Sequence, residues 1–270
     1  MMETTGKRGL SEAVLKNIAV LTMTIDHVTA FILKEYLVSQ GILNLYTNDW
    51  YTIGRVIGRI AFVLYAFMIA EGAYRTRNRW KYAVRLLALA VISIIPHSYV
   101  NARKLFNPAD LNIFFQLFLG LVTIYAFDWL RDHIENKWIS VLLRLLAAAA
   151  ACAISMKFHF EYGMMGILLI LVFYLFRYDY PKLFLFGFLV MSVGYMAHVV
   201  ISHGAIAWIN SHSHNLLMSL LNTDKIQIFG VLAFPLIYFY NGEKGRQLPK
   251  AFYYLFYPVH LGIIALILYA

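Results

Sequence analysis

Charged residues are scarce in this 270-residue chain, where Asp, Glu, Lys and Arg together make up only 14%. Soluble domains carry about 25% charged residues, so this chain lacks the charge that a soluble surface needs. The hydrophobic share of 61% and the mean hydropathy of +0.66 also exclude intrinsic disorder. The remaining class is a polytopic membrane protein, which we expect to be an all-α helix bundle.

Cysteine is almost missing as well. Cys152 is the single cysteine and follows the alanine run 147–151, so we expect no internal disulfide and a small buried apolar side chain here. The sequence has no glycine-rich phosphate loop and no nucleophile elbow. No metal is expected, because a metal needs three or four ligands and the sequence offers only two weak patterns, His212 with His214 and His159 with Glu161.

Long apolar stretches are what the sequence has in abundance. Nine of them have a spanning length of about 15–21 residues: 15–35, 53–72, 82–100, 111–130, 138–156, 162–176, 183–201, 226–240 and 251–269. The segment 204–221 mixes histidine, asparagine and serine with apolar residues, and we predict that it is re-entrant or interfacial. The sequence therefore predicts one domain over residues 1–270 with about nine transmembrane helices. The first stretch shows no small-residue cleavage site, which is typical of an uncleaved signal anchor.

The formal net charge of +9 comes from 23 Lys and Arg against 14 Asp and Glu. In a soluble chain this excess would indicate nucleic acid. Here the positions of the charges favour topology, because with a cytoplasmic N-terminus the inner segments hold sixteen Lys and Arg and the outer ones five. We therefore predict a multi-pass protein of the inner (plasma) membrane with its N-terminus in the cytoplasm and no nucleic-acid partner.

Several ionisable residues fall within the predicted spans, where a charge is costly and usually serves a function. At a rise of about 1.5 Å per residue, four spans place such groups at a similar depth in a core of about 30 Å. The convergent residues are Asp26, His27, Arg59, His97 and His260. The sequence therefore predicts a reactive or transport site near the membrane midplane. A single buried histidine such as His198 is more often a hydrogen-bonded core residue.

Helix geometry suggests how these groups pair. Adjacent helical residues point about 100° apart, so Asp26 and His27 do not face each other. We predict that Asp26 pairs with Arg59 across a helix interface, because an unpaired charge there would be expensive, and that His27 faces a cavity. Pro96 and Pro258 stand close to His97 and His260 and predict broken backbone beside the histidines.

A basic segment at the predicted inner face has two readings. It contains Arg75, Arg77, Arg79, Lys81 and Arg85, and Glu71 precedes it. The segment is explained by membrane topology alone, or it binds phosphate, which guanidinium groups hold in a bidentate manner.

Eight motifs resemble those of the TraX family, in order and over residues 15–265. They are LTMTIDH (21–27), IGRIAF (57–62) with YAFMIAEG (65–72), TRNRWKYAVRL (76–86), ISIIP (92–96), NIFFQLFLG (112–120), EYGMMGILLILVFY (161–174), YNGEKG (240–245) and FYYLFYPVHL (252–261). The family takes its name from a conjugation protein that N-acetylates pilin and is similar to multi-pass membrane acyltransferases. Val63 stands where the family pattern has proline and His97 where it has an aromatic residue.

The resemblance implies a membrane acetyltransferase. Cytoplasmic acetyl-CoA would be the acyl donor, with its phosphates near the basic segment and Glu71, and its thioester at the midplane site. His27 would be the general base, oriented by Asp26, Arg59 or His260, which would also stabilise the developing oxyanion. We predict that His97, Asn112 and Gln116 contact the acceptor, which is an amine or hydroxyl of a peptide, glycan or lipid. Direct transfer and a transient acetyl-histidine both stay open.

Two other functions are compatible with buried charges in a membrane. A proton-coupled transporter also needs midplane charges and broken helices, although no internal repeat is apparent. A structural partner in an envelope assembly would not need the polar cluster.

Overall fold

The computed structural model describes residues 9–42, 44–45, 48–177, 179–194 and 225–269. Within these ranges the secondary structure is helical, apart from two isolated bridges that join Leu10 to Tyr240 and Leu111 to Phe160. The elements in chain order are α1 (Glu12–His27), a π-helical turn (Val28–Leu33), α2 (Lys34–Ser39), α3 (Asp49–Arg75), α4 (Arg79–Ile92), α5 (Ile94–Ala102), α6 (Ile113–His133), α7 (Lys137–Lys157), α8 (Gly163–Leu175), α9 (Tyr180–Leu189), a second π-helical turn (Val190–Gly194), a 3₁₀ helix (Lys225–Ala233), α13 (Phe234–Tyr238) and α14 (Lys250–Tyr269).

Six helical segments are long and apolar enough to cross a membrane: Glu12–Ser39, Asp49–Arg75, Arg79–Ala102, Ile113–His133, Lys137–Lys157 and Lys250–Tyr269. The predicted all-α fold is therefore confirmed within the described residues, and the six candidate spans support a multi-pass membrane protein, whereas nine spans are not established. Three of the predicted spans coincide with shorter apolar helices, Gly163–Leu175, Tyr180–Gly194 and Ile226–Tyr238, below the roughly 20 residues that a spanning helix needs. The predicted segment 204–221 and His198 lie outside the described residues.

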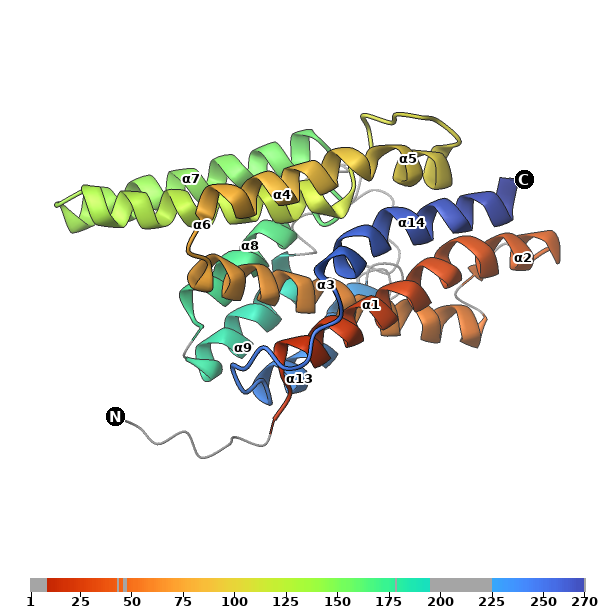
Figure 1. The fold of residues 1–270 in the computed structure, drawn as a ribbon, viewed down its shortest axis with the longest axis horizontal. Helices are drawn as coiled ribbons and strands as arrows, with labels where there is room; N and C mark the ends of the chain where they lie inside the picture. Colours follow the sequence, from red (N-terminus) through yellow and green to blue (C-terminus); the bar gives the residue numbers. More distant parts are fainter. Residues whose placement is uncertain (1–8, 43, 46–47, 178, 195–224, 270) are drawn as a thin grey trace, which may run out of the picture.

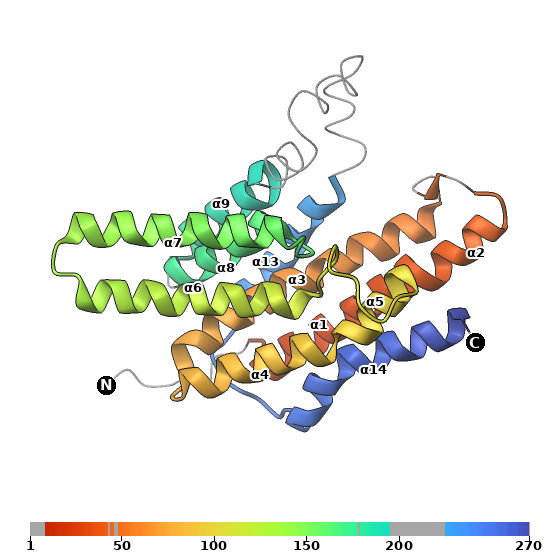
Figure 2. The same cartoon turned by 90° about the horizontal axis from the view of Figure 1, so that it is seen from above.

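Helix α3 forms the centre of the bundle. It packs against α1, α6, α8 and the 3₁₀ helix, while α14 packs against α5 and α1. The helices α6 and α7 run side by side as a long hairpin (Figures 1 and 2). Exposed apolar side chains on α7 and α14, such as Leu145 and Leu266, suit contact with lipid. The polar groups described below lie inside the bundle.

Asparagine side chains start four of these helices. Asn48, Asn78, Asn112 and Asn136 each accept a hydrogen bond from a backbone N–H in the first turn of α3, α4, α6 and α7. These caps satisfy donors that a helix leaves unpaired at its N-terminus.

The backbone departs from a regular α-helix close to two of the site histidines, His27 and His97. A π-helical turn begins directly after His27, and such turns are frequent at functional sites. Helix α4 stops before Ser93 and α5 resumes after it, which confirms the break predicted near Pro96. Helix α14 continues through Pro258, so the broken backbone predicted beside His260 is wrong; the helix tolerates the missing backbone N–H of this proline.

The segment before α1 meets the loop 239–244 at one end of the bundle. Backbone N–H groups of Leu10, Glu12 and Ala13 donate to carbonyls of the loop 239–244 over 2.8–3.0 Å. The Arg75 guanidinium donates to another carbonyl of the same loop over 2.6 Å. We call this region, where α1 and α4 begin and α3 ends, the basic end.

Two glycines on α3 allow α1 to approach closely. A Cβ at Gly54 would lie 2.2 Å from Thr29 Oγ1, and one at Gly58 would lie 2.2 Å from Asp26 Oδ1. Small residues four apart are a common contact surface between membrane helices. The spacing brings the Asp26 side chain against α3, where its two arginine partners lie.

The variant Gly58→Ala is expected to lower the free energy of unfolding by about 1–3 kcal/mol, because the added methyl overlaps the Asp26 side chain. Thermal unfolding in detergent measures this as a lower midpoint. Gly262→Ala on α14 is the control, since nothing lies within 4 Å of its Cβ position, and its midpoint should stay or rise slightly. Equal midpoints for Gly58→Ala and the wild type would contradict the tight α1–α3 contact.

Candidate functional site

A buried ion pair joins α1 to α3. Arg59 Nη2 donates to both oxygens of Asp26 over 2.7 Å, and Arg55 Nη1 donates to Oδ1 over 2.7 Å. Arg59 is 4% exposed and Asp26 7%, so each charge depends on the other for compensation. The predicted Asp26–Arg59 pair is confirmed, and Arg55 is a second partner. Arg59 Nη1 also donates to Gln227 Oε1 over 3.3 Å, which links the 3₁₀ helix to the pair.

His27 stacks on His260 of α14. The ring centroids lie 4.9 Å apart with an interplanar angle of 4°, and His27 Nδ1 lies 2.6 Å from His260 Nε2. The other nitrogen of His260, Nδ1, lies 2.7 Å from the Phe256 carbonyl oxygen.

These contacts assign the protons of both rings when they are neutral. A carbonyl oxygen only accepts, so His260 Nδ1 carries the proton and His260 Nε2 is an acceptor. His27 Nδ1 must then donate to it, and the lone pair of His27 lies on Nε2. The pair therefore fixes His27 in the tautomer whose Nε2 acts as a base.

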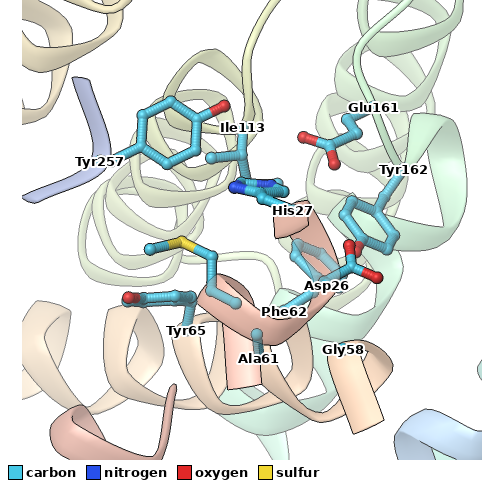
Figure 3. A pocket seen from close by; sticks show the side chains of 11 residues that line it. Asp26, His27, Gly58, Ala61, Phe62, Tyr65, Ile113, Glu161, Tyr162 and Tyr257 are labelled. Atoms are coloured by element: carbon cyan, nitrogen blue, oxygen red, sulfur yellow. The ribbon is translucent and has the colours of Figure 1, made fainter. Parts of the chain in front are cut away.

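A small pocket of about 30 Å³ lies beside His27 (Figure 3). This His27 pocket has room for a group of only a few atoms. The residues that line it are Met23, Asp26, His27, Gly58, Ala61, Phe62, Tyr65, Ile113, Glu161, Tyr162 and Tyr257. They come from α1, α3, α6, α14 and the loop before α8, so elements distant in sequence build it together.

A larger cavity of about 440 Å³ extends from the basic end to the same place. It shares Met23, Tyr65, Ile113 and Tyr257 with the His27 pocket. We call it the basic cavity, and its volume is typical of a ligand site. Four lining residues are common to the two spaces, so the basic cavity borders the pocket that contains His27.

Cationic side chains outnumber acidic ones in the lining of the basic cavity. The cations are Lys16, Arg75, Arg85, Lys244 and Lys250, and the acids are Glu12 and Glu71. Both acids are paired, Glu12 with Lys16 over 2.5 Å and Glu71 with Arg75 and Arg177. The cavity therefore offers uncompensated positive charge to an anionic ligand.

The Tyr240 hydroxyl is a further ligand group in this cavity. It is buried and finds no hydrogen-bond partner among the described residues, although it lines the cavity beside Arg75. Burial raises the pKa of Tyr240 to about 12, so the hydroxyl keeps its proton at neutral pH. It can donate to an anionic ligand.

Comparison with known proteins supports the resemblance seen in the motifs. The family model described as TraX protein matches residues 11–268. The chain belongs to the TraX family. A curated relative from Dichelobacter nodosus, named probable fimbrial assembly protein FimC, serogroup H1, is 28% identical over 253 residues, which cover 93% of this chain and 92% of the relative. No solved structure matches.

The basic segment of this TraX-family chain divides into two groups. Arg75, Arg85 and Glu71 line the basic cavity. Arg77, Arg79 and Lys81 are not part of its lining. Arg79 instead pairs with Asp128 over 2.6 Å and lies over the Tyr125 ring, so it joins α4 to α6.

The residues predicted to contact the acceptor do not line either space. The Asn112 side chain caps α6 and donates to the Ala90 carbonyl over 2.8 Å. Gln116 accepts from Ser155 and donates to the Gly163 carbonyl. Both amides are used by the fold, whereas His97 contacts the pocket residue Tyr257, with 3.1 Å between His97 Nδ1 and the hydroxyl oxygen.

Sequence reasoning missed several lining residues. Glu161 and Tyr162 lie in the motif EYGMMG, and Tyr257 lies in FYYLFYPVHL, so their motifs were visible but their roles were not. Lys16, Lys244 and Lys250 were counted among the charges that set membrane topology. Lys16 lies far in the sequence from the other two, so the sequence does not indicate that they line one cavity. Among the described residues no group of three His, Cys, Asp or Glu is placed to hold a metal ion.

Proposed function

We propose that this TraX-family protein is a membrane acetyltransferase that moves an acetyl group from acetyl-CoA to an amine or hydroxyl acceptor. One observation carries the proposal: a cavity with a cationic mouth meets the pocket of a histidine whose tautomer is fixed as a base. CoA carries phosphates at one end and its thioester at the other. The cavity has cations at its mouth, which would match the phosphates, and borders the His27 pocket at its other end, which would match the thioester.

The residues of the basic cavity fit the donor. Lys16, Arg85, Lys244 and Lys250 would bind the phosphates, and the Tyr240 hydroxyl would donate to one of them. Arg75 contacts both Glu71 and the loop 239–244, so its main role would be to fix the structure of the cavity mouth. The small volume of the His27 pocket suits a short acyl group.

His27 would perform the proton transfers. Its Nε2 takes the proton from the acceptor as the acceptor attacks the thioester carbonyl, and returns that proton to the departing thiolate. His260 acts through His27, since it holds the tautomer without touching the substrate. Direct transfer and a transient acetyl group on His27 both use these contacts. Acetyl-CoA supplied without acceptor distinguishes them, because only the second route labels the protein.

We propose that the basic end faces the cytoplasm, where acetyl-CoA is found. The bias of sixteen Lys and Arg against five supports this orientation in the inner membrane, and the three shorter helices would complete the nine crossings. The relative's name links it to fimbrial assembly, so we propose an acceptor in the cell envelope, whether a peptide, a glycan or a lipid.

Acetyl-CoA binding and turnover test the proposal. Mass spectrometry of the purified protein should find bound CoA, and protein in proteoliposomes should release free CoA when acetyl-CoA and an acceptor are supplied. Saturable solute flux without any dependence on CoA would instead establish a transporter. If the protein shows neither acetyl transfer nor solute flux, the remaining function is a structural role in an envelope assembly.

Removing cations of the basic cavity is expected to weaken donor binding. Arg85→Gln and Lys250→Gln should each raise the KM for acetyl-CoA by about 10–100-fold, because a hydrogen bond to a charged group is worth about 1.5–3 kcal/mol. Lys182→Gln is the control, since Lys182 is exposed and pairs with Asp179. Equal KM values in all three variants would place the donor elsewhere.

A further inference from the structure

Three polar side chains form a connected row that starts at the His27 pocket. Tyr257 lines both the pocket and the basic cavity. Its hydroxyl oxygen lies 3.1 Å from His97 Nδ1, and His97 Nε2 lies 3.4 Å from Asp110 Oδ2. The His97 side chain is 8% exposed and that of Asp110 36%, so the row leads from a buried pocket to the protein surface.

The ends of the row lie in different surroundings. Asp110 belongs to the loop between α5 and α6, and the cationic lining of the basic cavity does not include it. The Tyr257 ring packs edge-on to His27 with 5.9 Å between centroids. The row therefore connects the neighbourhood of His27 to water by a path separate from the mouth of the basic cavity.

We propose that Tyr257, His97 and Asp110 form a proton-transfer route from the His27 pocket to this surface. The route rests on the proposed acetyl transfer and concerns an acceptor that arrives as an ammonium. Acetylation of an ammonium releases one proton more than acetylation of the neutral amine. His27 cannot export this proton, because it returns its own proton to the thiolate.

The transfer balances in three steps. The ammonium gives a proton to the Tyr257 oxygen while the Tyr257 hydroxyl proton passes to His97 Nδ1. His97 becomes an imidazolium, which Asp110 stabilises as a paired carboxylate. His97 then gives its Nε2 proton to Asp110 and so to water. Tyr257 and His97 end with as many protons as they had, and the acceptor nitrogen has a free lone pair for attack.

The pocket also has a group that suits a cationic acceptor. Glu161 lines it, and its carboxylate points into the pocket towards His27 (Figure 3). Asp26 is paired with two arginines, whereas Glu161 has no ion pair within the described part of the chain. The charged and titratable groups around the route are Glu161 and Tyr162 before α8, Asp26 on α1 with Arg55 and Arg59 on α3, and the His27–His260 pair.

The route predicts a defect that depends on the charge of the acceptor. The probe is a short peptide with a free α-amine, whose pKa of about 8 leaves about a tenth of it neutral at pH 7 and nine-tenths at pH 9. With acetyl-CoA as donor and protein in nanodiscs, His97→Ala and Asp110→Asn should be about tenfold slower than the wild type at pH 7. At pH 9 they should come within about twofold, and the KM for acetyl-CoA should not change.

Imidazole added to His97→Ala should restore the rate at pH 7, because it can occupy the vacated place and carry the proton. Asp132→Asn, an exposed carboxylate at the tip of α6 that pairs with Arg131, is the control and should behave as the wild type. A defect of the same size at both pH values, with no rescue by imidazole, would mean that His97 only supports the fold and would overturn the route. A wild type that transfers no acetyl group would overturn the proposed function itself and the route with it.

Discussion

His27→Ala is expected to lower the rate of acetyl transfer by roughly 10²–10⁴-fold, the range that general acid–base catalysis contributes. The variant removes the Nε2 lone pair that the contact with His260 assigns to this ring. The KM for acetyl-CoA should stay within a few-fold, because the cationic lining of the basic cavity is untouched. Thiol release in proteoliposomes measures both quantities.

His133→Ala supplies the matched control, because His133 is an exposed histidine at the end of α6 that stacks on Trp129. Its rate should equal that of the wild type. His260→Ala should fall between the two, since His27 keeps its base but loses the partner that holds the tautomer. The assignment would be reversed if His260→Ala abolished transfer and His27→Ala retained it.

Asp26→Ala is expected to destabilise the protein by about 3–5 kcal/mol, the effect of leaving a buried charge without its partner. The variant leaves two guanidinium groups, Arg55 and Arg59, without their carboxylate. Thermal unfolding in detergent should show a large drop of the midpoint, and size-exclusion chromatography should show less monodisperse protein. Asp132→Ala should change little, because exposed ion pairs contribute about 0–1 kcal/mol.

A combined variant separates charge imbalance from lost packing. Replacing Asp26, Arg55 and Arg59 together by leucine removes all three charges, and hydrophobic replacement of a buried ion pair is often neutral or better. The triple variant should therefore unfold at a higher temperature than Asp26→Ala. A triple variant less stable than Asp26→Ala would show that the side chains contribute by shape and hydrogen bonding rather than by charge balance.

Charges in apolar stretches are the part of the site that the sequence predicts well. Asp26 and Arg59 had to find each other because neither tolerates burial alone, and the structure pairs them. His27 and His260 stand in separate spans at similar depth, and they meet in a stacked contact. In each case the high energy of a lone polar group in a membrane limits the arrangements that the chain can adopt.

Residues that are not costly in isolation were harder to place. Asn112 and Gln116 lie in a family motif, yet their amides serve a helix cap and a helix contact, and the sequence does not distinguish a motif kept for packing from one kept for chemistry. The three shorter helices stay predicted spans, because apolar composition alone does not show whether a helix of their described length crosses the membrane. Lys250 and Lys16 meet in one cavity only through the tertiary fold.

The packing of α14, a late helix, against α1, the first helix, has a consequence for biosynthesis. Helix α1 supplies Lys16 and His27, and α14 supplies Lys250, Tyr257 and His260. A nascent chain that has not yet inserted its last helix therefore lacks the mouth of the basic cavity, the partner of the base and the start of the proton route. Under the proposed function, the protein would therefore begin to use acetyl-CoA only after α14 has packed against α1 and α5.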